Sequence, residues 1–200
     1  MTVLGRACAD QRRWQHQHPT SDLGIAVNIS TQQLMAASFP DTVAAVLEAE
    51  NTDPKLLTLE VTESVFVRDS KRALIVLNDL KDLGVMIALD DFGTGYSSLS
   101  YLNQFPVDIV KIDRTFVANL GRDSVTEIIV TAVVQLAHAL HMSVIAEGIE
   151  TTEQHHTVTG LGCDSSQGFQ PRLLLHPTKG RGQHRNPPQT GGGAGGPRLP

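Results

Sequence analysis

Several features that identify common classes of protein are scarce or absent in this sequence. Only two of the 200 residues are cysteine, Cys8 and Cys163, and they match no redox or metal-binding spacing. Such usage is typical of a reduced, cytoplasmic protein. No apolar run approaches the ~18 residues that span a membrane, and the N-terminal MTVLGRACADQRRW lacks the apolar core of a signal peptide. We therefore predict a cytoplasmic protein without a membrane segment.

Acidic residues are missing from the end of the chain, because none follows Asp164. Five of the 16 basic residues lie in that last segment, so the first 164 residues carry 11 basic against 21 acidic side chains, a net charge of −10. An acidic body of this kind repels the phosphate backbone of DNA and RNA, and we expect neither polymer as a partner. A small nucleotide held through metal ions remains compatible with this charge.

The C-terminal segment also lacks apolar residues. From His176 onward it is rich in glycine and proline, and Leu199 is its only large apolar side chain. Such a segment cannot bury enough apolar surface to offset the entropy lost on ordering. We predict one domain over residues 1–175 and a disordered tail over residues 176–200.

Apolar runs of strand length alternate with helical patterns over the rest of the chain. The predicted strands are Ile25–Ile29, Leu56–Val61, Val85–Leu89, Val107–Ile112 and Met142–Ala146. The predicted helices are Val3–Trp14, a helix around Val43–Leu47 with Asp41 as N-cap, Lys71–Leu83 ended by Gly84, Ser124–Leu140 with a capping box of Ser124 and Glu127, and Thr152–Leu161. The alternation predicts an α/β fold with parallel strands and outer helices, a TIM-type barrel or most of one.

The helix predicted over 124–140 has the clearest periodicity. Its apolar residues form one continuous stripe: Val125, Ile128, Ile129, Ala132, Val133, Leu136 and Leu140. A stripe at helical spacing is the usual mark of the face that packs on a core.

Polar side chains collect where the predicted strands end. They are Asn28, Glu60, Asp90 with Asp91, Lys111 with Asp113, and Glu147. In a parallel barrel these ends share one face, where catalytic groups from several strands converge. Adjacent carboxylates repel each other unless a cation lies beside them, so the Asp90–Asp91 pair indicates a divalent metal ion. The oxygen-rich set has no histidine among its members, which favours Mg²⁺ or Mn²⁺ over zinc.

Lys111 would stay protonated among these carboxylates, where it can orient water or stabilise a transition state. Weaker interpretations exist for the same stretch. The string DDFG alone is compatible with an acidic turn before a helix, and Gly93 and Gly95 with turn geometry only. The string DFG also occurs in protein kinases, but no HRD precedes it here.

The motifs together resemble one family. The strings VNIS, LEVTES, LDDFGTGYSSL, VDIVKID and VIAEGIET, followed by QGF, are similar in order and approximate spacing to those of the EAL-type cyclic-di-GMP phosphodiesterases, over about Val3 to Phe169. The resemblance implies a modified TIM barrel that binds cyclic di-GMP and hydrolyses it to the linear dinucleotide with two Mg²⁺ or Mn²⁺ ions.

The resemblance also implies roles for individual residues. Asn28, Glu60 and Asp90 would bind the first metal ion, and Asp90 and Asp91 would contribute to the second, with Asp113 and Glu147 alongside. Lys111 would lie near the attacking water, so Lys111, Glu147 and Asp91 are the predicted catalytic residues. Gln167 would form hydrogen bonds in the site. Glu63 and Glu150 would support it, Glu63 by holding the loop that begins at Asp91.

The sequence departs from the family at both ends. The Glu-Ala-Leu motif, whose glutamate is a ligand of the first metal ion, is absent, and the sequence after QGF differs from the family. We therefore expect a partial EAL domain with unpaired strand edges that favour a homodimer, and impaired phosphodiesterase activity. The alternative is a non-catalytic module in bacterial signalling that binds cyclic di-GMP or a partner protein.

Overall fold

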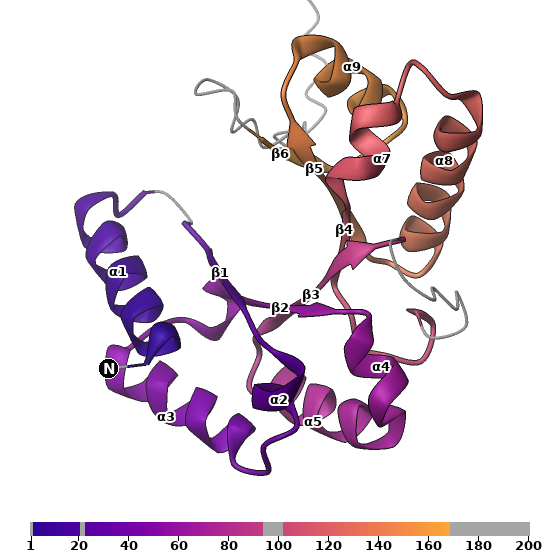
Figure 1. Ribbon diagram of the computed structural model, residues 1–200. Coiled ribbons are helices and arrows are strands. Elements are labelled where there is room, and N and C mark those ends of the chain that lie inside the picture. Colours follow the sequence, from indigo (N-terminus) through magenta and orange to yellow (C-terminus); the bar gives the residue numbers. More distant parts are fainter. Residues whose placement is uncertain (1, 21–22, 94–101, 169–200) are drawn as a thin grey trace, which may run out of the picture.

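The fold is an open, curled parallel sheet with helices on its outer side. It is known from a computed structural model, which describes residues 2–20, 23–93 and 102–168. Within these ranges the sheet has six strands in chain order. They are β1 (Ile25–Asn28), β2 (Leu57–Thr62), β3 (Met86–Phe92), β4 (Ile109–Ile112), β5 (Ser143–Ile149) and β6 (Ser165–Gly168). Figure 1 shows the sheet curving into part of a barrel, which confirms the predicted α/β, incomplete TIM-type architecture.

The predicted helices are all present, with ends that differ by a few residues. The helices are α1 (Val3–Gln17), α2 (Thr31–Leu34), α3 (Phe39–Glu50), α4 (Ser64–Arg68), α5 (Ser70–Asp82), α7 (Arg114–Asn119), α8 (Ser124–Ala139) and α9 (Thr152–Gly160), with a 3₁₀ turn, η1 (Pro54–Leu56). The sequence did not predict the short elements α2, α4, α7 and β6, because a segment of four to six residues shows no reliable hydrophobic periodicity. The predicted tail, 176–200, lies outside the described residues, as does Gly95.

The main core lies between the sheet and the helices, outside the curve of the sheet. Leu59, Ile87 and Val110 face the helices and are completely buried. Met86 and Ile109, which precede two of them and point to the inner face, are only half-buried. The inner face of the sheet therefore contributes little to the core. The polar residues lie at the carboxyl ends of its strands.

Two predicted helix caps are wrong. Helix α3 begins earlier than its apolar pattern indicates, with Ser38 as N-cap, so Asp41 lies in its first turn. Helix α8 is capped by Asp123, whose carboxylate accepts hydrogen bonds from the backbone N–H groups of Val125 and Thr126, 3.0 and 3.2 Å long. Glu127 instead accepts from the backbone N–H of Gly121. An aspartate one residue upstream supplies two acceptor oxygens and displaces the predicted serine cap.

The apolar stripe of α8 does not all pack on the core. Val125, Ile128 and Ile129 are 59%, 67% and 42% exposed, whereas Val130 and Val134 on another face are buried. The helix is apolar on both faces, so its sequence period could not distinguish the inner face from the outer one.

Gly84 ends helix α5 in the way that the sequence predicts. Its φ is +91°, and its N–H donates to the carbonyl of Lys81. We expect Gly84→Ala to lower the free energy of unfolding by about 1 kcal/mol, since a side chain disfavours this conformation. Chemical denaturation measures the change. Gly160→Ala is the control, because Gly160 has open space around it and no positive φ. Equal effects of the two substitutions would contradict the prediction.

Candidate active site at the strand ends

Strand β3 carries one extra residue where the two aspartates lie. Its pairing with β4 shifts between Leu89 and Phe92, so that Asp90 and Asp91 together oppose Lys111. Asp91 has a left-handed backbone, with φ of +56°. Neighbouring residues of a regular strand point to opposite faces, whereas a bulge re-aims one of them. The strand therefore extends past its predicted end at Leu89, and the bulge accounts for two adjacent carboxylates near one site.

Lys111 lies at the centre of the site. Its Nζ is 2.8 Å from Glu60 Oε1, 3.0 Å from Asp90 Oδ1 and 2.7 Å from Glu147 Oε1, and its side chain is only 5% exposed. The ammonium group thus has an acceptor for each of its three N–H donors. Burial lowers the pKa of Lys111, but the three hydrogen bonds outweigh this effect and hold it above its usual value. Lys111 is therefore a permanent cation and a hydrogen-bond donor.

The carboxylates around Lys111 carry an excess of negative charge. Burial raises the pKa of Glu147. Burial and the charges of Asp90 and Asp113 raise the pKa of Asp91. Asp113 is itself partly desolvated, but hydrogen bonds from Thr115 lower its pKa, so it stays ionised. Repulsion within the group is thus not fully offset by the lysine, and a further cation would relieve it.

The donor chemistry fits a hard divalent cation. Carboxylate oxygens from three strands meet at one place, and such ligands suit Mg²⁺, Mn²⁺ or Ca²⁺. Among the described residues, however, no group of three or more histidine, cysteine, aspartate or glutamate side chains is arranged as a ready metal site. The ammonium of Lys111 is the cation that these oxygens surround here.

Other predicted residues flank this group to different degrees. Asn28 and Gln167, both exposed, end the outer strands β1 and β6 and pair in register with Glu60 and Glu147. Glu63 Oε1 accepts a 2.8 Å hydrogen bond from the N–H of Gly93, which ties the end of β3 to the start of α4. Glu150 lies apart.

The position of Glu150 is that of a residue at a helix start. It is exposed, and its N–H donates to Gln154 Oε1, the side chain that also closes a capping box with Thr151 at α9. Among the described residues, its hydrogen bonds are those of a helix start and not of the strand-end site.

Arg114 is a functional candidate that the sequence interpretation missed. Its positive charge lies near Asp91 and Asp113 and stabilises their ionised forms. Arg114 also lies against a second bulge, at Gly148. There the pairing of β5 with β6 shifts between Glu147 and Ile149. The string KIDR was the available signal, since the arginine directly follows Asp113.

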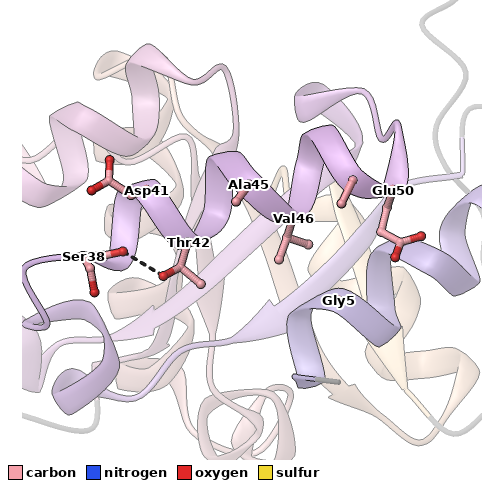
Figure 2. Close-up of a pocket in the computed structure, with 8 residues that line it drawn as sticks. Gly5, Ser38, Asp41, Thr42, Ala45, Val46 and Glu50 are labelled. Carbon is pink, nitrogen blue, oxygen red and sulfur yellow. Dashed lines mark hydrogen bonds between the residues drawn. The ribbon is translucent and has the colours of Figure 1, made fainter.

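A shallow groove elsewhere on the molecule contains none of the predicted site residues. It runs between α1 and α3, and its floor and walls include Gly5, Ser38, Thr42, Ala45 and Val46. Figure 2 shows Thr42, Ala45 and Val46 along α3 and Gly5 on the neighbouring helix α1, with the hydroxyl of Thr42 donating to the carbonyl of Ser38. The strand-end cluster, and not this groove, is the candidate site.

Comparison with known proteins identifies the family of the chain. The family model described as the EAL domain matches residues 1–170. The chain belongs to the EAL domain family. This EAL chain is 44% identical over 167 residues to the bifunctional diguanylate cyclase/cyclic di-GMP phosphodiesterase MucR of Pseudomonas aeruginosa, covering 84% of the chain and 24% of MucR. It is 40% identical over 178 residues to an uncharacterized protein of Mycobacterium tuberculosis, covering 89% of the chain and 28% of that protein.

Solved structures share the fold of this EAL chain. The phosphodiesterase MucR in complex with cyclic di-GMP superposes with a TM-score of 0.78 at 44% identity, over 83% of this chain and 67% of that one. BlrP1 of Klebsiella pneumoniae, solved with manganese and cyclic di-GMP, gives a TM-score of 0.74 at 29% identity, over 83% and 43% of the two chains. Both structures thus contain cyclic di-GMP, the first is of a phosphodiesterase, and the second also contains manganese.

The chain matches only part of each curated relative. The EAL chain spans 24% and 28% of the length of the two curated relatives described above. Among its described helices, none has the length and apolar character needed to cross a bilayer.

Proposed function

We propose that this chain forms the catalytic part of a cyclic-di-GMP phosphodiesterase that cleaves the cyclic dinucleotide to its linear form. The observation that carries the proposal is the convergence of Glu60, Asp90 and Glu147 on Lys111 at one end of a parallel sheet. Catalytic groups of (β/α) barrels occupy this end. The family relationship supplies the substrate class.

Two Mg²⁺ or Mn²⁺ ions would be held by Asn28, Glu60, Asp90, Asp91 and Asp113, and would activate water and neutralise charge on the phosphate. Lys111 cannot accept a proton, so its role is to donate hydrogen bonds to the water or to a phosphate oxygen. Glu147, whose pKa is raised by burial, would exchange a proton near the phosphate, and Asp91 would act there as a metal ligand. Gln167 and Glu63 would orient the substrate and the loop after β3.

Metal removal tests this proposal. We expect the purified chain to bind cyclic di-GMP in a calorimetric titration with Mn²⁺ or Mg²⁺, and to bind at least about tenfold more weakly after chelation with EDTA, because the phosphates then face uncompensated carboxylates. Conversion to the linear dinucleotide, followed by chromatography, should depend on the same ions. Metal-independent binding of equal strength would contradict two-metal catalysis.

A non-catalytic module that binds cyclic di-GMP is the second candidate function. The observation that favours it is the ammonium group of Lys111, which already lies between the carboxylates of Glu60, Asp90 and Glu147. Binding without turnover in the calorimetric and chromatographic experiments would select the second candidate. The homodimer and the cytoplasmic location stay predictions.

A further inference from the structure

The short helix α7 lies between the ends of two strands that carry site carboxylates. It follows β4 directly, and Asp113 is its N-cap. It packs against the end of β5. Lys111 is only three residues before the first residue of this helix, so any shift of α7 acts on the strand end that carries the lysine.

Two glycines allow α7 to approach both neighbouring strand ends. A Cβ on Gly148, at the β5 bulge, would overlap the Cβ of Arg114 and lie 3.2 Å from its Cα. A Cβ on Gly93, at the end of β3, would lie 2.7 Å from Cε2 of Phe116. Real Cβ atoms essentially never approach other heavy atoms within 3.0 Å, so a side chain at Gly148 or Gly93 would force Arg114 or Phe116 to shift.

Each contact is linked to a carboxylate of the site. Gly148 directly follows Glu147, whose carboxylate is 2.7 Å from Lys111 Nζ. Gly93 follows the bulge that carries Asp90, whose carboxylate is 3.0 Å from the same nitrogen. The N–H of Gly93 is in addition held by Glu63.

We propose that α7 is a positioning element: Arg114 and Phe116, seated on Gly148 and Gly93, set the spacing of the β5 and β3 ends at which Glu147 and Asp90 both reach Lys111. The expected effect of α7 on cyclic di-GMP binding rests on the proposed function. The expected effect of α7 on the contacts of Lys111 concerns the ligand-free chain and does not depend on that function.

The chain contains a matched control for the backbone strain of such a test. Gly148 and Gly121 have φ of +72° and +77°, but a Cβ on Gly121 would meet nothing within 4 Å. Gly148→Ala and Gly121→Ala therefore introduce similar strain, and only the first adds an overlap with α7. Any difference between the two variants reports the contact.

The first readout is the ammonium group of Lys111, observed by ¹H–¹⁵N NMR of lysine side chains in the ligand-free chain. In Gly148→Ala we expect its protons to exchange with water about tenfold faster than in the parent, because the shell of carboxylates loosens. Gly121→Ala should leave the exchange unchanged. The second readout is cyclic di-GMP titrated in the presence of Mn²⁺, which should bind about tenfold more weakly to Gly148→Ala only.

A second pair of variants applies if Gly148→Ala fails to fold by circular dichroism. Gly93→Ala should loosen Lys111 in the same way, and Phe116→Leu in the same chain should restore slower exchange, because leucine lacks the ring atoms that would be hit. Equal exchange in Gly148→Ala and Gly121→Ala, or additive losses in the Gly93–Phe116 pair, would overturn the inference. A parent chain that does not bind cyclic di-GMP would overturn the proposed function, and the exchange data would still decide the role of α7.

Discussion

Replacement of Lys111 by methionine is expected to lower the free energy of unfolding by about 3–5 kcal/mol in metal-free buffer, the usual range for breaking a buried ion pair on one side. Methionine keeps an unbranched apolar stem like that of lysine but leaves Glu60, Asp90 and Glu147 without their common cation. Denaturant-induced unfolding, followed by circular dichroism, measures the change. The same variant should hydrolyse cyclic di-GMP at least about 100-fold more slowly, because a preorganised donor is lost.

Manganese distinguishes this variant from an ordinary loss of packing. If the carboxylates also bind divalent ions, Mn²⁺ should stabilise Lys111→Met more than the parent, because added positive charge replaces the lost ammonium. Lys81→Met is the matched control. Lys81 is paired with Asp108 at 2.7 Å, but this pair lies at the opposite, amino-terminal end of the strands. Its loss should lower stability without any gain from Mn²⁺. An equal response of both variants to Mn²⁺ would count against a metal site at Lys111.

The second large effect is expected for Asp90→Asn. Asp90 is the one residue for which the family resemblance implies contact with both metal ions, and it also contacts Lys111. We expect hydrolysis to fall by about 100-fold or more, together with most of the thermal stabilisation that Mn²⁺ gives to the parent. The amide keeps the size of the side chain, so the effect reports lost charge.

Two further variants make this prediction sharper. Asp91→Asn should give a smaller loss, because Asp91 is exposed, whereas Asp90 is less exposed and forms an ion pair with Lys111. Asp82→Asn, on the exposed end of α5, should behave like the parent. Retention of Mn²⁺-dependent stabilisation in Asp90→Asn at the level of Asp82→Asn would show that Asp90 is not a ligand.

The sequence predicted five of the six described strands, and it led to a candidate site at the strand ends, because both inferences depend on periodic or terminal patterns. Apolar strands of four to seven residues and polar residues at their ends are visible without coordinates, and parallel pairing brings those ends together. The contacts of Lys111 with Glu60 and Glu147 follow from this rule, although 51 and 36 residues, respectively, separate the pairs.

What the sequence did not predict depends on single-residue geometry. The bulges at Asp91 and Gly148 change the register by one residue, and no period reports such a change. The cap at Asp123 competes with a serine one position later, and both have good capping chemistry. The exposed stripe on α8 arises because that helix is apolar on more than one face.

The burial of the core on the helix side of the sheet has a consequence for how such a protein can change. Residues such as Leu59 and Ile87 stabilise the fold by packing between the sheet and the outer helices. The carboxylates of the site lie on the inner side of the sheet and repel one another. Substitutions that remove a carboxylate therefore relieve repulsion and leave the main core untouched. A phosphodiesterase with this arrangement can therefore lose catalytic turnover and still fold. Few substitutions would then convert such an enzyme into a receptor that binds the same dinucleotide.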